Sequence, residues 1–304
     1  MPIAVGKTLL FSGGLDSLAA ALEFSDQTTL LGLVSHRTRN RATISTQDAL
    51  VAELEKDGRA VVHYPFFVSS SDAGTLDHDV EATQRTRSFL FLVLAALVAR
   101  RTGRREILYM AENGQMAIHL PLTQARIGAF STHTAHPDVL LAMQGFLSAA
   151  LGQGFAIENP YLLRTKREVV KIVRDKRPDL VPLASSCWKN SRVAGGHCGE
   201  CVPCFVRRIA IESLGKDGTT YKRDVWAEDF TALPPGDTGR RNLADLAEFR
   251  LLLAQQSPAE LLLTFPELRS NSFDGDAAID MYKRWADEAA QVWGRYPTLR
   301  RLLS

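Results

Sequence analysis

The sequence lacks a long apolar run and an excess of charge of one sign. No stretch of about 18 consecutive apolar residues occurs, which argues against a membrane-spanning helix. The opening MPIAVGKTLLFSGG has neither a long apolar core nor a small-residue cleavage site, so we expect no signal peptide and a cytoplasmic protein. The 36 basic and 34 acidic residues leave a net charge of +2. This balance does not favour a nucleic-acid scaffold or a membrane-surface protein.

Internal repeats, low-complexity tracts and two common nucleotide-binding motifs are also absent. The segment Val5-Gly6-Lys7-Thr8 ends like a Walker A loop, but the first glycine of that motif would fall at Met1. The dinucleotide fingerprint G-x-G-x-x-G does not follow the first apolar run either. The 304 residues, 45% of them hydrophobic, suffice for one large domain or two modest ones with a packed core.

Strand-like and helix-like segments alternate over the first half of the chain. Short apolar runs predict buried strands at residues 8–11, 29–34, 60–67 and 106–110, and a fifth near 156–157. Helical patterns lie at residues 15–24, 45–56, 81–101 and about 165–174. This alternation predicts an α/β fold with a parallel five-stranded sheet and helices on both faces.

The pattern changes after residue 177 to a cysteine-rich loop and mostly helical segments, including residues 242–255 and 277–293. We therefore predict two units, residues 1–181 and residues 182–304. The helical extension carries the aromatic residues Trp226, Phe230, Trp285, Trp293 and Tyr296. Two interpretations remain open for it: a cap that stabilises the fold, or a docking surface for a macromolecule.

The first predicted strand leads into a loop of two glycines, two serines and one aspartate. In a parallel sheet, ligands gather at the carboxyl ends of the strands, where such a loop presents backbone N–H groups at a helix N-terminus. Glycines allow close approach of an anion, hydroxyls donate to phosphate oxygens, and a carboxylate offers a ligand to Mg²⁺. A plain glycine turn with a Ser or Asp cap is the alternative. The residues are Ser12, Gly13, Gly14, Leu15, Asp16 and Ser17.

This loop resembles the SGGxDS signature of the PP-loop ATP pyrophosphatases, which cleave ATP to AMP and pyrophosphate while adenylating their substrate. The resemblance implies a HUP-like fold, with ATP and Mg²⁺ bound at residues 12–17. The signature does not identify the substrate.

All four cysteines, Cys187, Cys198, Cys201 and Cys204, lie in one short stretch. Two overlapping C-x-x-C steps and a fourth thiol eleven residues earlier fit a tetrahedral thiolate site. We predict a structural Zn²⁺, since four thiolates leave no open coordination position and a reducing compartment disfavours disulfides. An iron–sulfur cluster and a redox pair are the alternatives, and His197 could replace one sulfur.

The cysteine motif, followed by Arg207-Arg208, is similar to the zinc signature of the 7-cyano-7-deazaguanine synthase family, which also opens with SGGxDS. QRTRSFLFLVLAALVA resembles that family's R-N-x-x-F-L helix and places Arg87 on its arginine. NPYLLRTKREVVKIV resembles its P-x-x-x-x-T-K-x-E segment and places Lys166 on its lysine. Alone, both would be solvated helix charges. The resemblance, which covers about residues 7–212, makes them candidate catalytic residues beside Asp16.

Members of that family adenylate 7-carboxy-7-deazaguanine with ATP, let ammonia displace AMP, and dehydrate the resulting amide to the nitrile. The resemblance therefore implies an ATP-dependent C–N ligase with a 7-deazaguanine substrate, in queuosine or deazapurine biosynthesis. The chemistry is reasonable because AMP is a far better leaving group than a carboxylate oxygen, and N–H groups with Mg²⁺ stabilise pyrophosphate.

The sequence departs from the family after the fourth predicted strand, where the nitrile-forming enzymes carry N-E-x-D-Y-S-G-Y-P-D-C. Here the stretch MAENGQMAIHLPLTQARIGAFSTHTAHPDVL keeps the asparagine and forms a polar loop at the predicted sheet edge. We predict substrate contacts from this loop. The candidate residues are Glu112, Asn113, Arg126, Ser131 and His133, with Thr132 and His136 beside them. Capping of the next helix by His136-Pro137 is the alternative for that histidine.

Longer, pocket-altered relatives of this family occur in anti-phage defence gene clusters, and the lost stretch and long extension resemble them. The resemblance implies that the acyl group passes to the amino terminus of a partner protein. Ammonia as acceptor, in a 7-cyano-7-deazaguanine synthase, remains the first alternative. A PP-loop tRNA-modifying enzyme and a binding protein without turnover are the others. The sequence leaves open whether the chain forms a homodimer.

Overall fold

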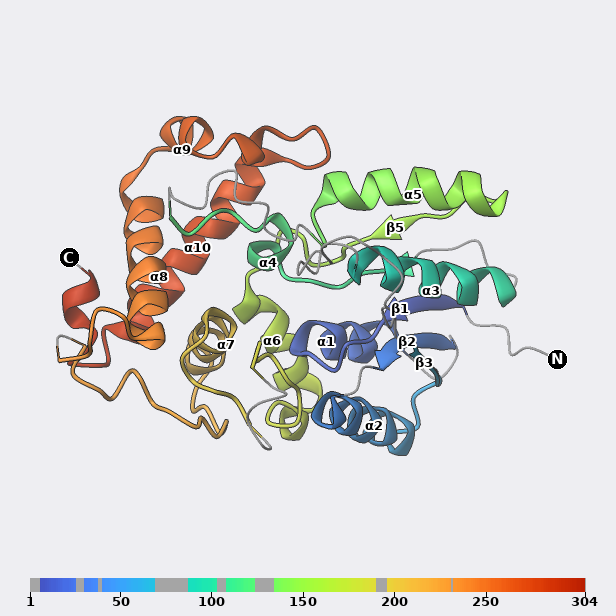
Figure 1. Ribbon diagram of the computed structural model, residues 1–304, viewed down its shortest axis with the longest axis horizontal. Helices are drawn as coiled ribbons and strands as arrows, with labels where there is room; N and C mark the ends of the chain where they lie inside the picture. Colours follow the sequence, from blue (N-terminus) through green and yellow to red (C-terminus); the bar gives the residue numbers. More distant parts are fainter. Residues whose placement is uncertain are drawn as a thin grey trace, which may run out of the picture.

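The computed structural model describes residues 6–25, 30–37, 40–68, 87–102, 108–123, 134–189, 196–230 and 232–303 (Figure 1). The sheet and the elements around it are β1 (Lys7–Leu10), α1 (Leu15–Phe24), β2 (Leu31–Arg37), α2 (Arg41–Lys56), β3 (Val61–Phe67), α3 (Arg87–Arg101), β4 (Leu108–Tyr109), α4 (Gly114–Ile118), α5 (Pro137–Leu151), β5 (Ile157–Glu158) and α6 (Lys166–Lys176). The later helices are α7 (Val202–Glu212), α8 (Thr238–Gln255), α9 (Pro258–Thr264) and α10 (Gly275–Trp293), with 3-10 turns at Pro178–Leu180, Pro266–Arg269 and Arg300–Leu303.

The strands form one sheet in the order β3-β2-β1-β4-β5, and every pairing is parallel. The predicted parallel α/β class is therefore confirmed. The body of the sheet consists of β1, β2 and β3, because β4 and β5 have only two residues each. Of the strand expected at residues 106–110, Leu108–Tyr109 form β4, residues 106–107 lie outside the described residues, and the Met110 N–H donates to the Glu158 carbonyl at 3.0 Å.

Alternating residues of the strands face two separate cores. Leu9, Leu31 and Leu33 pack with α1, α2 and α6, whereas Leu10 and Val34 pack with α3 and α5. Figure 1 shows these two groups of helices on opposite sides of the sheet. This arrangement follows from the period of two along a strand, since successive side chains point to opposite faces.

Capping residues explain where the helices begin. Helix α1 has the predicted bounds, and Gly14 is its N-cap. Helix α2 begins four residues before the predicted start because the Asn40 side chain accepts from the Ala42 N–H. Helix α6 begins with a capping box in which Thr165 and Glu168 satisfy each other's backbone N–H groups. Helix α4 lies where we expected only a loop, and Asn113 caps it.

The C-terminal helices enclose a third core. Trp226, Trp285 and Trp293 are buried in it, together with Ile118 and Leu120 near α4. Phe230 and Tyr296 are partly buried against the same core. These aromatic residues therefore do not form an exposed docking surface. The division at residue 181 stays a prediction. Among the described residues, no helix is long and apolar enough to cross a membrane.

Candidate functional site

The glycine loop between β1 and α1 is held in a fixed shape. Gly13 has a φ of +82°, and a side chain there would also come within 3.2 Å of the Thr46 methyl group. The Gly14 N–H donates to the Ser12 hydroxyl at 3.2 Å, and the Ser17 hydroxyl donates to the Gly14 carbonyl at 3.0 Å. The two hydroxyl oxygens lie 3.3 Å apart at the start of α1. The loop thus places polar groups at a helix N-terminus, where anions are stabilised.

Asp16, on the first turn of α1, is the centre of a buried polar cluster and is only 6% exposed. One carboxylate oxygen, Oδ2, accepts from the Lys166 ammonium at 2.6 Å and from the Asn113 amide at 3.1 Å. The other oxygen, Oδ1, is buried and has no hydrogen-bond partner among the residues that the structure describes. An unpartnered buried carboxylate oxygen is a ligand that suits a hard cation such as Mg²⁺.

Glu112 adds a second carboxyl group to this cluster. Burial, and then the negative charge of Asp16, raise the pKa of Glu112 to about 8, against the opposing effect of Lys166. The Glu112 carboxyl group therefore keeps its proton to a higher pH than an exposed glutamate does, and it can donate this proton to Asp16. When both are deprotonated, the two carboxyl groups offer oxygen ligands that suit a hard divalent cation, so Asp16 and Glu112 are the residues that would hold Mg²⁺.

Two adjoining cavities open onto this cluster. The smaller, about 200 Å³, is lined by Asp16 and Lys166. The larger, about 990 Å³, lies at the carboxyl ends of β1 and β2 between α2 and α3, and Arg87 lines it. Ser12 and Glu112 belong to the walls of both cavities. The larger volume is in the range of cofactor and substrate sites, and its position at the sheet edge is where α/β proteins bind ligands.

Ser185, Ser186 and Trp188, which sequence analysis did not single out, line both cavities, and the predicted zinc ligand Cys187 lines the larger one. The Ser185 N–H donates to the Gly13 carbonyl at 3.0 Å, and the Ser186 N–H donates to the His197 ring at 3.2 Å. Burial lowers the pKa of His197 to about 4, so its Nε2 atom accepts this bond at neutral pH. The buried Arg207 guanidinium donates to the Ala184 carbonyl at 3.0 Å. The only sequence signal for this segment is its position beside Cys187.

The four cysteines come together as predicted. Their sulfur atoms all lie within 4.8 Å of one another and are buried, and those of Cys198 and Cys204 are 3.8 Å apart. A tetrahedral site with Zn–S bonds of about 2.3 Å requires sulfur atoms about 3.8 Å apart, so the cluster fits Zn²⁺. The Cys187 sulfur also accepts from the backbone N–H groups of Lys189 and Cys198. Gly199 permits the turn, because a side chain there would meet the Arg223 carbonyl oxygen at 1.9 Å.

The other predicted residues have different outcomes. Arg87 lies at the start of α3 with its guanidinium 5.7 Å from the Phe91 ring centre, on the larger cavity and apart from the residues lining the smaller one. His136 caps α5 by accepting from the Asp138 N–H at 3.3 Å, which bears out the capping alternative. The Asn113 side chain donates to the Asp16 carboxylate and accepts from the Met116 N–H at the start of α4. Arg126, Ser131, Thr132 and His133 lie outside the described residues.

Comparison with known proteins identifies the family. A family model described as "Queuosine biosynthesis protein QueC" matches residues 7–215, which is more than half of the chain. The chain belongs to the QueC family. The match includes the glycine loop, the Asp16 cluster and all four cysteines, and it ends before α8 and α10.

Curated relatives of the chain are named 7-cyano-7-deazaguanine synthase. The protein of Paracidovorax citrulli is 28% identical over 235 residues, which cover 67% of this chain and 94% of the relative. That of Chelativorans sp. is 27% identical over 244 residues, covering 75% and 98%. That of Brucella canis is 26% identical over 234 residues, covering 72% and 94%. Other members of this QueC family are thus named as enzymes that make a 7-deazaguanine.

Proposed function

We propose that this QueC-family protein is an ATP-dependent ligase that adenylates the carboxylate of 7-carboxy-7-deazaguanine and passes the acyl group to an amine. The observation that carries the proposal is the buried cluster of Asp16, Lys166 and Glu112 beside the glycine loop. The cluster lies where two cavities meet, one of them large enough for a nucleotide and a base. The names of the relatives support the 7-deazaguanine substrate.

In the proposed reaction, a carboxylate oxygen of the substrate attacks the α-phosphorus of ATP, the bond to the bridging oxygen breaks, and pyrophosphate leaves. The amine nitrogen then attacks the acyl carbon, AMP leaves with the electrons of the C–O bond, and the nitrogen loses a proton. The N–H groups of the glycine loop bind phosphate oxygens, and Asp16 and Glu112 would hold Mg²⁺, which would supply positive charge to the departing pyrophosphate. Lys166 and Arg87 supply further positive charge. Zn²⁺ at the four cysteines holds residues 185–188 and takes no part in the chemistry.

For the acceptor amine, we propose the amino terminus of a partner protein, in a cytoplasmic anti-phage defence system. Two features support this choice over ammonia: the loss of the D-Y-S-G-Y-P-D-C stretch and an extension beyond the family match. The second candidate is a 7-cyano-7-deazaguanine synthase, which the names of the relatives favour.

The test is ATP–pyrophosphate exchange that depends on 7-carboxy-7-deazaguanine, followed by mass analysis of the products with ammonium and with candidate partner proteins. We expect Asp16→Ala to lower the exchange rate more than 100-fold, because it removes the unpartnered carboxylate oxygen Oδ1 and leaves the Lys166 ammonium without its counter-charge. Asp175→Ala, an exposed aspartate on α6, is the matched control and should retain activity. Exchange that does not depend on the deazaguanine would contradict the proposal. Accumulation of the nitrile would favour the synthase.

A further inference from the structure

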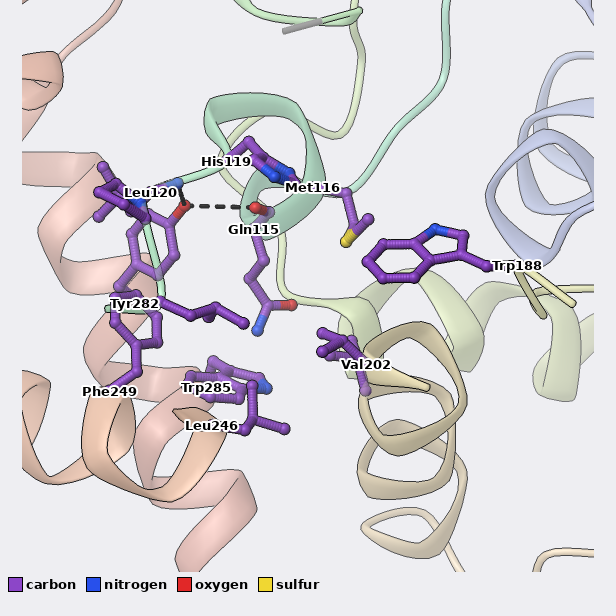
Figure 2. A pocket seen from close by; sticks show the side chains of 13 residues that line it. Gln115, Met116, His119, Leu120, Trp188, Val202, Leu246, Phe249, Tyr282 and Trp285 are labelled. Carbon is purple, nitrogen blue, oxygen red and sulfur yellow. Dashed lines mark hydrogen bonds between the residues drawn. The ribbon is translucent and has the colours of Figure 1, made fainter. Parts of the chain in front are cut away.

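A third cavity, of about 240 Å³, lies between α4, residue Trp188 and the helices α7, α8 and α10 (Figure 2). It shares the side chains of Met116, Val206 and Trp188 with the small cavity around Asp16 and Lys166. The far wall comes from α8 and α10, which lie beyond residue 215, where the family match ends. The cavity is thus a neighbour of the proposed adenylation site, and the extension completes it.

Most of the lining is apolar. Leu246 and Phe249 line the cavity from α8, Val202 lines it from α7 on the opposite side, and Leu120 lines it just after α4 (Figure 2). An apolar cavity of about 150 Å³ is sufficient to bind benzene. A cavity of about 240 Å³ therefore has room for an isobutyl or benzyl group and for the atoms that link it to a reacting amine.

The polar residues that line the cavity are Gln115, His119, Tyr282 and Trp285, and the indole of Trp285 offers a buried donor without an acceptor in the described part of the chain. The Tyr282 hydroxyl is already satisfied, since it accepts from the Leu120 N–H and donates to the Gln115 carbonyl, both at 3.3 Å. The indole N–H of Trp285 has no hydrogen-bond partner among the described residues, although this side chain is only 2% exposed. Figure 2 shows its nitrogen on the side that faces Val202 across the cavity.

Gln115 provides a second donor. Its side-chain oxygen accepts from the Lys166 N–H at 3.0 Å, and Figure 2 shows its amide group extending into the cavity. A ligand that fills the cavity takes these two donors away from water, so it should carry a hydrogen-bond acceptor next to its apolar part, because a donor buried without an acceptor is costly. Ammonia has no such part.

We propose that this cavity binds the apolar side chain of the acceptor amine, whose adjacent carbonyl oxygen accepts from Trp285 and Gln115. The acceptor class is then an α-amino compound with a large apolar side chain, either free or as the first residue of a polypeptide. This inference rests on the proposed ligase function. The shared walls place the amine next to the small cavity, where the acyl-adenylate forms.

Binding can be measured without turnover. The chain has four tryptophans, of which Trp188 and Trp285 line this cavity and Trp226 and Trp293 lie in the core behind it. In protein labelled with 5-fluorotryptophan, L-leucinamide and L-phenylalaninamide should shift the ¹⁹F resonances of Trp188 and Trp285 and leave the other two in place. Glycinamide, which has the same amine and carbonyl, should bind at least tenfold more weakly because it lacks the apolar side chain.

Variants separate cavity filling from general damage to the fold. Leu246→Phe places a larger side chain in the cavity, and Leu252→Phe makes the same change on α8 at a position that does not line it. We expect Leu246→Phe alone to raise the KM for leucinamide more than tenfold, with ATP–pyrophosphate exchange within twofold of the native rate. Trp285→Phe should weaken leucinamide several-fold and leave isobutylamine, which has no carbonyl, unchanged.

The outcomes distinguish this inference from the proposed function. If exchange is normal but the Trp285 resonance does not move, or if glycinamide reacts as fast as leucinamide, the acceptor cavity is wrong and the ligase stands. If Trp285 responds but no exchange occurs, the ligase proposal fails and the acceptor role fails with it. A tripeptide amide that begins with leucine, compared with leucinamide, identifies the source: a higher kcat/KM for the peptide indicates a polypeptide acceptor.

Discussion

Asp16, Asn113 and Lys166 are far apart in the sequence but are joined by hydrogen bonds at the Asp16 cluster. The side chains of Asp16 and Lys166 are 9% and 8% exposed, so their ion pair is screened little by solvent. A buried pair is costly to break because the remaining charge stays desolvated. Asn113 holds the same carboxylate oxygen, which fixes the direction of the orphan oxygen. Lys166 and Asn113 together therefore hold the Asp16 carboxylate in one orientation.

We predict that Lys166→Met lowers the free energy of unfolding by about 3 kcal/mol or more, because it leaves the Asp16 carboxylate buried without a counter-charge. The double variant Asp16→Asn with Lys166→Met should recover most of this loss, and neither should support ATP–pyrophosphate exchange. Urea unfolding and the exchange assay give the two readouts. Lys171→Met, at an exposed position of the same helix, is the control. Additive losses in the double variant would show that the pair does not interact.

Glu288 of α10 gives a prediction for pH. Burial is the main cause that raises its pKa from 4.5 to about 7. The folded protein thus holds this proton more tightly than the unfolded chain, so the free energy of unfolding falls as pH rises from about 4.5 to 7. Glu288→Gln should therefore be more stable than the native protein by up to about 3 kcal/mol at pH 8, with a smaller difference at pH 5.5.

Urea unfolding at the two pH values checks this expectation. The glutamine retains an oxygen that can accept from the Thr165 hydroxyl, as Glu288 does at 2.9 Å. Asp287→Asn, an exposed neighbour on α10, removes one negative charge and should show no such dependence. A stability difference that is equal at both pH values would contradict the assigned titration.

At the scale of elements, α10 supports the start of α6, where Lys166 lies. Glu288 accepts from the capping residue Thr165, and the Arg284 guanidinium donates to Glu168, the other half of the capping box, at 3.0 Å. Helix α10 begins outside the family match, so the extension takes part in placing a residue of the shared site.

Sequence analysis predicted the elements whose signals are local. The bounds of α1, the start of α6 near residue 165 and the cysteine cluster all follow from neighbouring residues or short spacing. It missed α4 and the contacts of Ser185 and Ser186, because these depend on distant parts of the chain, such as Gly13 for Ser185 and His197 for Ser186. That Asp16 and Lys166 belong to one site was predicted only from the family resemblance, because no local sequence pattern shows that residues 150 positions apart are in contact.

The cysteine loop leads to a prediction about metal. We expect one Zn²⁺ per chain by elemental mass spectrometry, and its loss in Cys201→Ser. Loss of the metal should release residues 185–188 from the glycine loop and lower ATP–pyrophosphate exchange at least tenfold. His197→Ala is the matched control, because His197 binds the Ser186 N–H and is not one of the four clustered ligands. Full zinc content in Cys201→Ser, or zinc loss in His197→Ala, would show that the ligand set is wrong.

At the scale of the whole molecule, the extension shares its core with the part of the chain that the family model matches. Trp226, Trp285 and Trp293 pack in one cluster with side chains from within the family match. Those side chains are Ile118, Leu120, Val202, Phe205, Val206 and Ile209, all at most 6% exposed. Each fully buried apolar side chain contributes about 1.5–3 kcal/mol, so exposing them would cost on the order of 10 kcal/mol. That is about the whole stability of an ordinary domain.

We therefore predict that a chain ending at Gly215 does not fold, although the family match ends at that residue. Thermal unfolding of the purified fragment, followed by circular dichroism, should show no cooperative transition. A chain that lacks only residues 300–304 is the control and should still unfold cooperatively. A fragment that unfolds cooperatively and retains ATP–pyrophosphate exchange would show that the shared core is dispensable. In that case α8 and α10 would serve only the acceptor, and the fragment should react equally well with glycinamide and leucinamide.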